Sequence, residues 1–396
     1  MVDWWNGMPT AIFPWSSGSR QLYRYMLAQG TEFSLQGGIR PVNNILRIGM
    51  AMVAFMAIFE ASLQAQEAPE GAITLRIVTD QPEAALDILD KRARGEAIAE
   101  ADWQRHRETE GYRRLKKRSE SFGATEFDSK FESFLGEFPE ALESREDLRK
   151  TVEDWSDLPL YEVGKVALAY LPEGAMLRGS IYPVVKKPTN SFVFEIDTDP
   201  AIFLYIDPEV GAEKFANTLA HELHHIGGSS ACGEPEGYEQ LDPDVRNAID
   251  WLSGFGEGLA MLAAAGGPDA DPQAHSDPEQ RATWARNLAR FDQDIARLEA
   301  FFLDVAAGKL TDEERRQQGF TFINTEEAPQ GAFYTVGWQM AVMVEKALGR
   351  EIVIRSVCDP RELLVAYNRV AAASAPETHP PPALWSETLL ARLYGR

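Results

Sequence analysis

The segment His221-Glu222-Leu223-His224-His225 places two histidines four positions apart, with a glutamate directly after the first. On an α-helix such positions are about 40° apart around the axis and about one turn along it, so both imidazoles project from one face. Two imidazoles in this arrangement suit a single zinc ion. Glu222 projects roughly 100° away from His221, close enough to accept a proton from a water at such a site. The spacing therefore predicts two zinc ligands and a general base.

The flanking residues predict a helix around this motif. Asp207-Pro208-Glu209 has the form of an N-cap, a proline in the first turn and an early acidic residue. The pair Gly227-Gly228 is typical of a helix end. His224 does not share the spacing and is interpreted as a packing or supporting residue. The simpler alternative is a buried amphipathic helix whose histidines are hydrogen-bonded core residues.

The motif resembles that of the zincins, a superfamily of metallopeptidases. The resemblance implies a zinc ion bound by both histidines and a third protein ligand, a glutamate base, and hydrolysis of a peptide bond. The metzincin branch would place its third histidine at position 231, which is Ala231. The gluzincin branch takes a glutamate from a later helix, and Glu257 is the best match. Thermolysin-like gluzincins carry Asp at the position of Met261, so the resemblance to that subfamily is weak. The chain is more similar to uncharacterised bacterial predicted zinc-dependent peptidases with a Glu-Gly-Leu-Ala third-ligand helix. This likeness covers about residues 190–350.

The residues around Glu257 support this assignment independently. Asp242-Pro243 predicts a second helix start, and the run from Asp244 to Ala265 has helical periodicity before Gly266-Gly267-Pro268. A carboxylate on a small, apolar helix face needs a partner, because burying an unpaired charge is expensive. Alternatively, Glu257 is solvated or pairs with an arginine. Small residues on its face, Gly254, Ala260 and Ala264, predict close approach to the motif helix, and the fallback ligands are Asp250, Glu234, Glu236 and Glu239.

Two further residues are weighed for catalysis. Zincins often use a Tyr or His to hydrogen-bond the oxyanion, and Tyr334, on a helix predicted from about Gln330 to Gly349, is the candidate. A core aromatic residue is the alternative for Tyr334. His275 lies in a Pro- and Asp-rich loop and is interpreted as an exposed residue without a catalytic role.

The composition indicates a globular, acidic protein. The 396 residues are 44% hydrophobic and 10% aromatic, enough for two lobes. The formal charge of −22 argues against nucleic-acid binding and against an anionic membrane surface. Cys232 and Cys358 are the two cysteines; they either pair in an oxidising compartment or are unrelated buried thiols.

The N-terminal region predicts export. Residues 1–39 are rich in Trp, Gly and Ser and are interpreted as an N-terminal extension, with a true start downstream of Met1 as the alternative. Residues 40–65 contain a short apolar run and are predicted to be a signal peptide cleaved after Ala65. The mature protein is then periplasmic or secreted, without a stable membrane anchor. A buried helix of the folded protein is the alternative for the apolar run.

The remaining chain predicts an α+β, predominantly helical fold. Residues 66–175 form a mainly helical N-terminal lobe, and residues 176–396 a zincin-like metallopeptidase region with a C-terminal helical part. A small antiparallel sheet is expected directly before the motif helix, and by resemblance one of its strands lies at the edge along which a peptide substrate aligns. The predicted strands are Met176–Val185, Ser191–Ile196 and Ala201–Ile206.

The pattern as a whole predicts a zinc-dependent peptidase that binds one Zn²⁺ and a peptide or protein substrate. Two alternatives from other classes stay open: an exported zinc-binding scaffold without catalysis, and a metal-free helical partner-binding protein. A hydrolase of a non-peptide amide is a third. The sequence carries no signal for the physiological substrate, for endo- or exo-cleavage, or for the oligomeric state.

Overall fold

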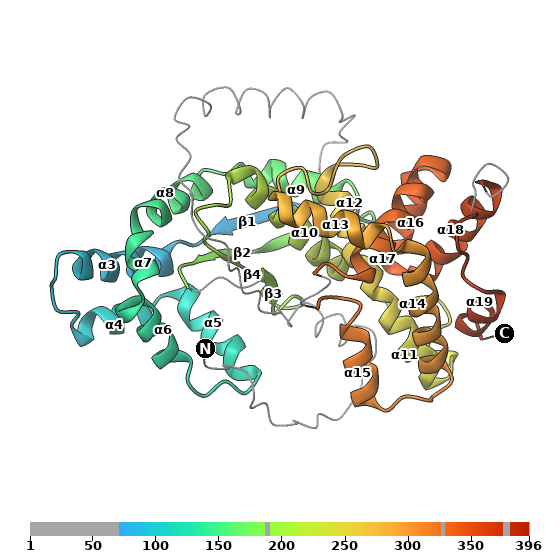
Figure 1. Ribbon diagram of the computed structural model, residues 1–396, viewed down its shortest axis with the longest axis horizontal. Coiled ribbons are helices and arrows are strands. Elements are labelled where there is room, and N and C mark those ends of the chain that lie inside the picture. Colours follow the sequence, from blue (N-terminus) through green and yellow to red (C-terminus); the bar gives the residue numbers. More distant parts are fainter. Residues whose placement is uncertain (1–70, 187–190, 326–328, 375–380, 396) are drawn as a thin grey trace.

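The computed structural model describes residues 71–186, 191–325, 329–374 and 381–395. The expected N-terminal extension and signal peptide lie outside the described residues. Within them the fold is α+β and predominantly helical, as predicted, with four strands between two groups of helices (Figure 1).

The four strands form one mixed sheet in the order β1-β2-β4-β3. Strand β2 pairs in parallel with β1 and β4, whereas β3 pairs antiparallel with β4 and lies at the edge. The expectation of an antiparallel sheet was therefore wrong. A long helical crossover joins β1 to β2, which permits parallel pairing, and β4 returns between β2 and β3 instead of beyond β3. The bounds are β1 Ile73–Ile77, β2 Leu177–Val184, β3 Phe192–Phe194 and β4 Ala201–Tyr205.

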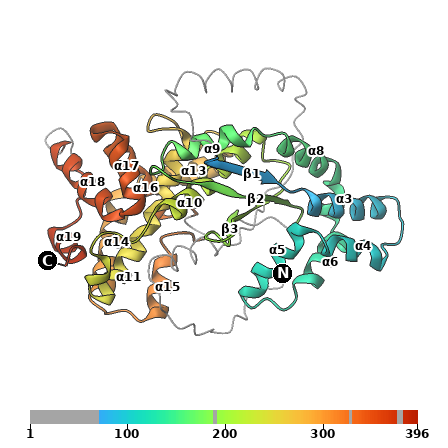
Figure 2. The same cartoon turned by 180° about the vertical axis from the view of Figure 1, so that it is seen from behind.

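Seven helices connect β1 to β2 and form the first helical group. Helices α3 to α8 extend to one side of the sheet, whereas α9 lies next to the motif helix (Figures 1 and 2). Their apolar faces share one hydrophobic core with the sheet and with part of the motif helix. Within this core the ring of Trp155 stacks on Phe215, with the two centroids 3.9 Å apart. The helices are α3 Asp80–Ala93, α4 Glu100–Arg107, α5 Glu110–Ser121, α6 Phe127–Glu137, α7 Pro139–Glu143, α8 Arg145–Ser156 and α9 Leu160–Leu168.

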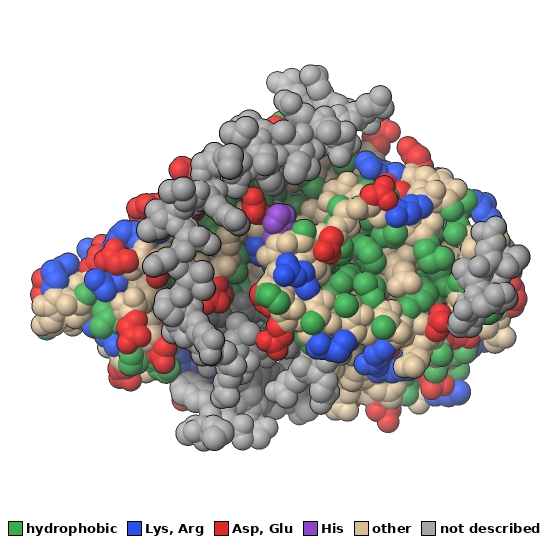
Figure 3. Space-filling view, turned by 45° about the horizontal axis from the view of Figure 1, so that its top comes forward, with side chains coloured by type: hydrophobic (Ala, Val, Ile, Leu, Met, Phe, Trp, Pro, Cys, Tyr) green, Lys and Arg blue, Asp and Glu red, His purple; other side chains and the backbone are tan. Residues whose placement is uncertain are grey.

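The second helical group follows the sheet in sequence. Most of its helices after the motif helix pack around a separate hydrophobic core, whereas the buried apolar residues of the motif helix belong to the first core. Figure 3 shows hydrophobic side chains gathered on the surface of this half, whereas charged side chains of both signs are prominent on the other. The proposed boundary between residues 66–175 and 176–396 stays a prediction. The helices are α10 Ala212–Ala231, α11 Pro243–Leu252, α12 Gly256–Ala265, α13 Pro278–Leu288, α14 Phe291–Ala306, α15 Asp312–Phe320, α16 Ala332–Leu348, α17 Arg350–Cys358, α18 Pro360–Ser374 and α19 Glu387–Leu393.

A disulfide bond joins Cys232 to Cys358, with their Cα atoms 5.0 Å apart. Cys232 directly follows α10, and Cys358 is the last residue of α17. The structure thus selects the paired alternative, and the bond fastens the end of the motif helix to the C-terminal helices. Across the described residues, no helix has both the length and the apolar character needed to cross a membrane.

Candidate active site

The motif lies on α10, but the helix limits differ from those predicted. Asp207 does not begin the helix, because its carboxylate accepts a hydrogen bond from the amide of Glu209 in a separate turn, and α10 starts after Gly211. Gly227 and Gly228 do not end it either, since the helix continues to Ala231. A Cβ on Gly227 would lie 2.1 Å from Leu171 Cδ1. The glycine is therefore needed for close packing and not for helix termination.

Glu257 lies on α12, which is shorter than the single helix expected for this region. The predicted start is correct, because Asp242 caps α11 by accepting a hydrogen bond from the amide of Asp244. The chain then passes through a 3₁₀ turn at Ser253–Phe255 before α12, which ends at Gly266 with φ of +84°. A Cβ on Gly254 would lie 2.6 Å from Phe333, so this glycine permits close contact with α16 and not with the motif helix.

His221, His225 and Glu257 converge on one point. His221 Nε2 lies 3.0 Å from both Glu257 Oε2 and His225 Nε2, and His225 Nε2 lies 3.4 Å from the same carboxylate oxygen. Their ligand atoms all lie within 4.8 Å of one another, which is close enough to hold one metal ion. Among the described residues, this is the group of three or more His, Cys, Asp or Glu side chains that lies this close together. The structure therefore brings together the three side chains predicted as ligands.

The spacing of these donor atoms fits a zinc ion. Zinc bonds of about 2.0–2.1 Å in a tetrahedral site separate neighbouring ligand atoms by about 3.3 Å. The observed separations of 3.0, 3.0 and 3.4 Å lie close to that value. Two imidazoles and one carboxylate are also a donor set that zinc accepts with a further position left for water.

The charges of the cluster stabilise one another within the protein. Burial disfavours an imidazolium at His225, but the neighbouring carboxylate of Glu257 outweighs it and raises the pKa of His225. Burial likewise disfavours a carboxylate at Glu257, yet His225 and His221 hold its pKa well below the ordinary range. Glu257 thus remains ionised although its side chain is only 7% exposed. An ionised carboxylate is the form that binds a metal cation.

The predicted base Glu222 is buried next to the cluster and does not belong to it. Its Oε1 accepts a hydrogen bond of 2.8 Å from Ser191 Oγ. Sequence reasoning missed this partner. The available signal was that Ser191 opens a predicted strand close to the motif helix, but register and strand order were needed to place its side chain.

Tyr334 lies beside His221 of the cluster. Its ring stacks on the His221 imidazole with 6.1 Å between the centroids and 8° between the planes. Tyr334 is half-buried and comes from the first turn of α16. It is therefore more than a remote core aromatic, and its proposed contact with an oxyanion stays a prediction.

The other candidates lie outside the cluster. The buried carboxylate of Asp250 accepts a hydrogen bond of 2.6 Å from the hydroxyl of Tyr238, and burial raises the pKa of Asp250 to about 7. His224 lines a separate cavity of about 110 Å³, and burial lowers its pKa to about 3. His275 is exposed, as expected, and lies 3.5 Å from Glu213. The fallback ligands Asp250, Glu234, Glu236 and Glu239 do not join the three-residue cluster.

Comparison with known proteins identifies a family for most of the chain. Residues 98–375 match a family model described as "Putative zinc dependent peptidase (DUF5700)", a range that contains the whole cluster, Glu222 and Tyr334. No curated protein and no solved structure shows a significant match. The match covers well over half of the sequence, and the chain is therefore a member of this family.

Proposed function

We propose that the protein hydrolyses peptide bonds at a single zinc ion held by His221, His225 and Glu257. The observation that carries this proposal is the convergence of the three donor atoms at separations that suit a tetrahedral ion. Family membership supports a peptidase, and the residue assignment rests on the geometry.

Each side chain has a separate task in this proposal. A bound zinc ion acidifies a water molecule and polarises the substrate carbonyl. Glu222 accepts a proton from the attacking water on its carboxylate and later donates it to the leaving amine. Tyr334, stacked beside His221, donates a hydrogen bond from its hydroxyl to the oxygen that becomes negative as the carbonyl carbon turns tetrahedral.

The edge strand β3 offers a place for the substrate backbone. It pairs with β4 on one side, and Ser191, the residue directly before it, contacts the base Glu222. An extended peptide added to the outer side of β3 would run past Glu222. This placement follows the strand position expected from the resemblance to zincins.

Metal analysis and peptide cleavage test the proposal together. Elemental mass spectrometry of the wild-type protein should find one zinc ion per chain, and a peptide library should be cleaved. Glu222→Gln should keep zinc and lose turnover, whereas His221→Ala should lose both. Cleavage by Glu222→Gln at the wild-type rate would refute the assigned base.

The same measurements separate the alternatives. A structural zinc site is closed by four protein ligands, whereas the described residues supply three at this cluster. Zinc without cleavage of any peptide would indicate the scaffold function. Absence of zinc from protein purified without chelators would indicate the metal-free one.

A further inference from the structure

The carboxylate of Glu222 is held by a residue from a different element. Ser191 Oγ donates a hydrogen bond of 2.8 Å to Glu222 Oε1 across a sequence separation of 31 residues. We propose that Ser191 is a positioning residue for the base, an inference that rests on the proposed peptidase function. With Oε1 bonded to Ser191, Oε2 is the oxygen left to exchange the proton.

A base in this position needs a fixed orientation. Glu222 is only 5% exposed, so water does little to hold its carboxylate. Its side chain has several rotatable bonds, and proton transfer requires the carboxylate within hydrogen-bond reach of the attacking water. A hydrogen bond to a charged acceptor is short and directional, so one donor suffices to select a rotamer.

Ser191 is itself held in place by the residue that follows it. Phe192 begins β3, is buried, and pairs with Phe203 of β4. The guanidinium of Arg118 on α5 lies over the Phe192 ring, with Cζ 3.6 Å from the ring centroid. The backbone at Ser191 is therefore anchored from the sheet and from the N-terminal helices.

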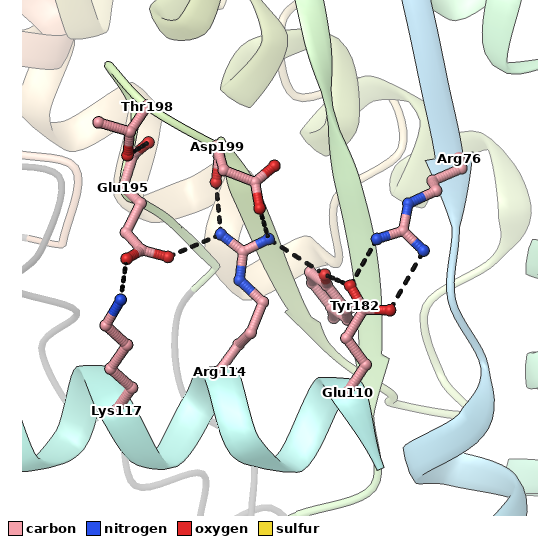
Figure 4. A network of polar contacts seen from close by, with 8 residues as sticks. All are labelled: Arg76, Glu110, Arg114, Lys117, Tyr182, Glu195, Thr198 and Asp199. Atoms are coloured by element: carbon pink, nitrogen blue, oxygen red, sulfur yellow. Dashed lines mark hydrogen bonds and ion pairs between the residues drawn. The ribbon is translucent and has the colours of Figure 1, made fainter.

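The far end of the same hairpin is fastened to α5 as well. Glu195 directly follows β3 and has a φ of +55°. Its carboxylate forms ion pairs with Arg114 and Lys117 of α5 (Figure 4). Arg114 also donates to the hydroxyl of Tyr182 on β2. Through these contacts α5 holds the edge strand against the sheet, and the strand presents Ser191 to Glu222.

Replacement of Ser191 tests the inference. Ser191→Ala should bind zinc as the wild type does and keep KM within about twofold, while kcat falls about tenfold, because only the orientation of the base is lost. Ser191→Thr, which retains the hydroxyl, should recover kcat to within about threefold of wild type. The matched control is Ser133→Ala, which removes a serine-to-glutamate hydrogen bond of the same 2.8 Å length on the exposed face of α6 and should leave kcat unchanged.

A double-mutant cycle distinguishes positioning of Glu222 from a general effect on the fold. Glu222→Asp shortens the base by one methylene, so its carboxylate withdraws from Ser191 but still accepts protons. In that background Ser191→Ala should lower kcat less than threefold. A tenfold loss in both backgrounds, or an unchanged kcat for Ser191→Ala in the wild-type background, would overturn the inference. In those cases the wild type would still bind zinc and cleave peptides, whereas failure of the proposed function would show in the wild type itself.

Discussion

Glu257 Oε2 lies 3.0 Å from His221 Nε2, although 36 residues separate the two positions in the chain. Two helices create this contact: α10 presents the imidazole, and α12, which follows the 3₁₀ turn at Ser253–Phe255, presents the carboxylate. If both residues bind the same cation, replacing either one should weaken its binding, and mutation of Glu257 tests this.

Glu257→Gln should weaken zinc binding by at least about 100-fold, more than the loss typical of residues that only support a ligand. The neutral amide removes the negative charge that offsets the ion in this buried site. Competition with a chromogenic chelator measures the affinity. Glu234→Gln, at an exposed acidic position outside the cluster, is the control and should bind zinc normally. Equal affinities for the two variants would remove Glu257 from the ligand set.

Tyr334→Phe should lower kcat by about 10²-fold with little change in KM or zinc content, because one donor to the oxyanion is lost while the ring remains. Phenylalanine keeps the stacking on His221. Steady-state kinetics on a cleaved peptide measure the effect, and Tyr161→Phe, at a half-exposed surface position, serves as control. If kcat is unaffected, Tyr334 is a packing residue.

Asp250→Asn should stabilise the protein increasingly as pH rises. Burial raises the pKa of Asp250 to about 7, so the folded protein binds this proton more tightly than the unfolded chain does. The stabilising contribution of the protonated group is complete below about pH 4 and is lost as pH rises toward about 7. Asparagine stays neutral and still accepts the hydrogen bond from Tyr238.

Thermal melts at pH 4.5 and pH 8 measure this difference. The variant and the wild type should have similar Tm values at the lower pH, and the variant should be higher by several degrees at pH 8. Asp269→Asn, at a highly exposed position, should show no such pH-dependent gain. A Tm difference that is constant with pH would contradict the assignment of this titration to Asp250.

Reduction of Cys232–Cys358 should lower the free energy of unfolding by about 4 kcal/mol, because the bond closes a loop with a sequence separation of 126 residues. Denaturant titrations with and without reductant measure the loss. The double variant Cys232→Ser/Cys358→Ser should be insensitive to reductant. The zinc content should not change on reduction at 25 °C. None of the three proposed ligands is a cysteine, and α10 and α12, which carry them, also pack through their apolar residues.

The predicted signal peptide specifies where the mature chain should begin. The signal peptide at residues 40–65 stays a prediction, as does the oxidising compartment in which a Cys232–Cys358 bond would persist. N-terminal sequencing of the periplasmic or secreted protein should begin at Gln66. Recovery of a mature protein that still contains residue 40 would rule out this processing.

The site was predictable from the sequence to the extent that it depends on local spacing. Two histidines four positions apart on a helix must share a face, and Glu257 was recognisable as a carboxylate on an otherwise apolar helix. The strand order was not predictable, because short apolar strands look alike whether their neighbours run parallel or antiparallel. The predicted helix end failed at Gly227, where glycine serves close packing and not termination, and Gly254 packs against α16 instead of the motif helix.

The contact between Ser191 and Glu222 was not predictable from the sequence either. A serine at the start of a short strand has no periodic pattern that marks its partner. Its role arises from β4 lying between β2 and β3, which brings the start of the edge strand to the motif helix. Non-local strand order of this kind leaves no trace in the spacing of residues.

Gly258 allows α12 and α16, the helices that carry Glu257 and Tyr334, to approach each other closely. A Cβ at this position would lie 2.1 Å from the backbone nitrogen of Trp338, so α12 and α16 meet backbone to backbone and neither can slide over the other. Glu257 on α12 and Tyr334 on α16 are therefore carried by two helices in direct backbone contact, and any side chain larger than hydrogen at position 258 would push these two residues apart.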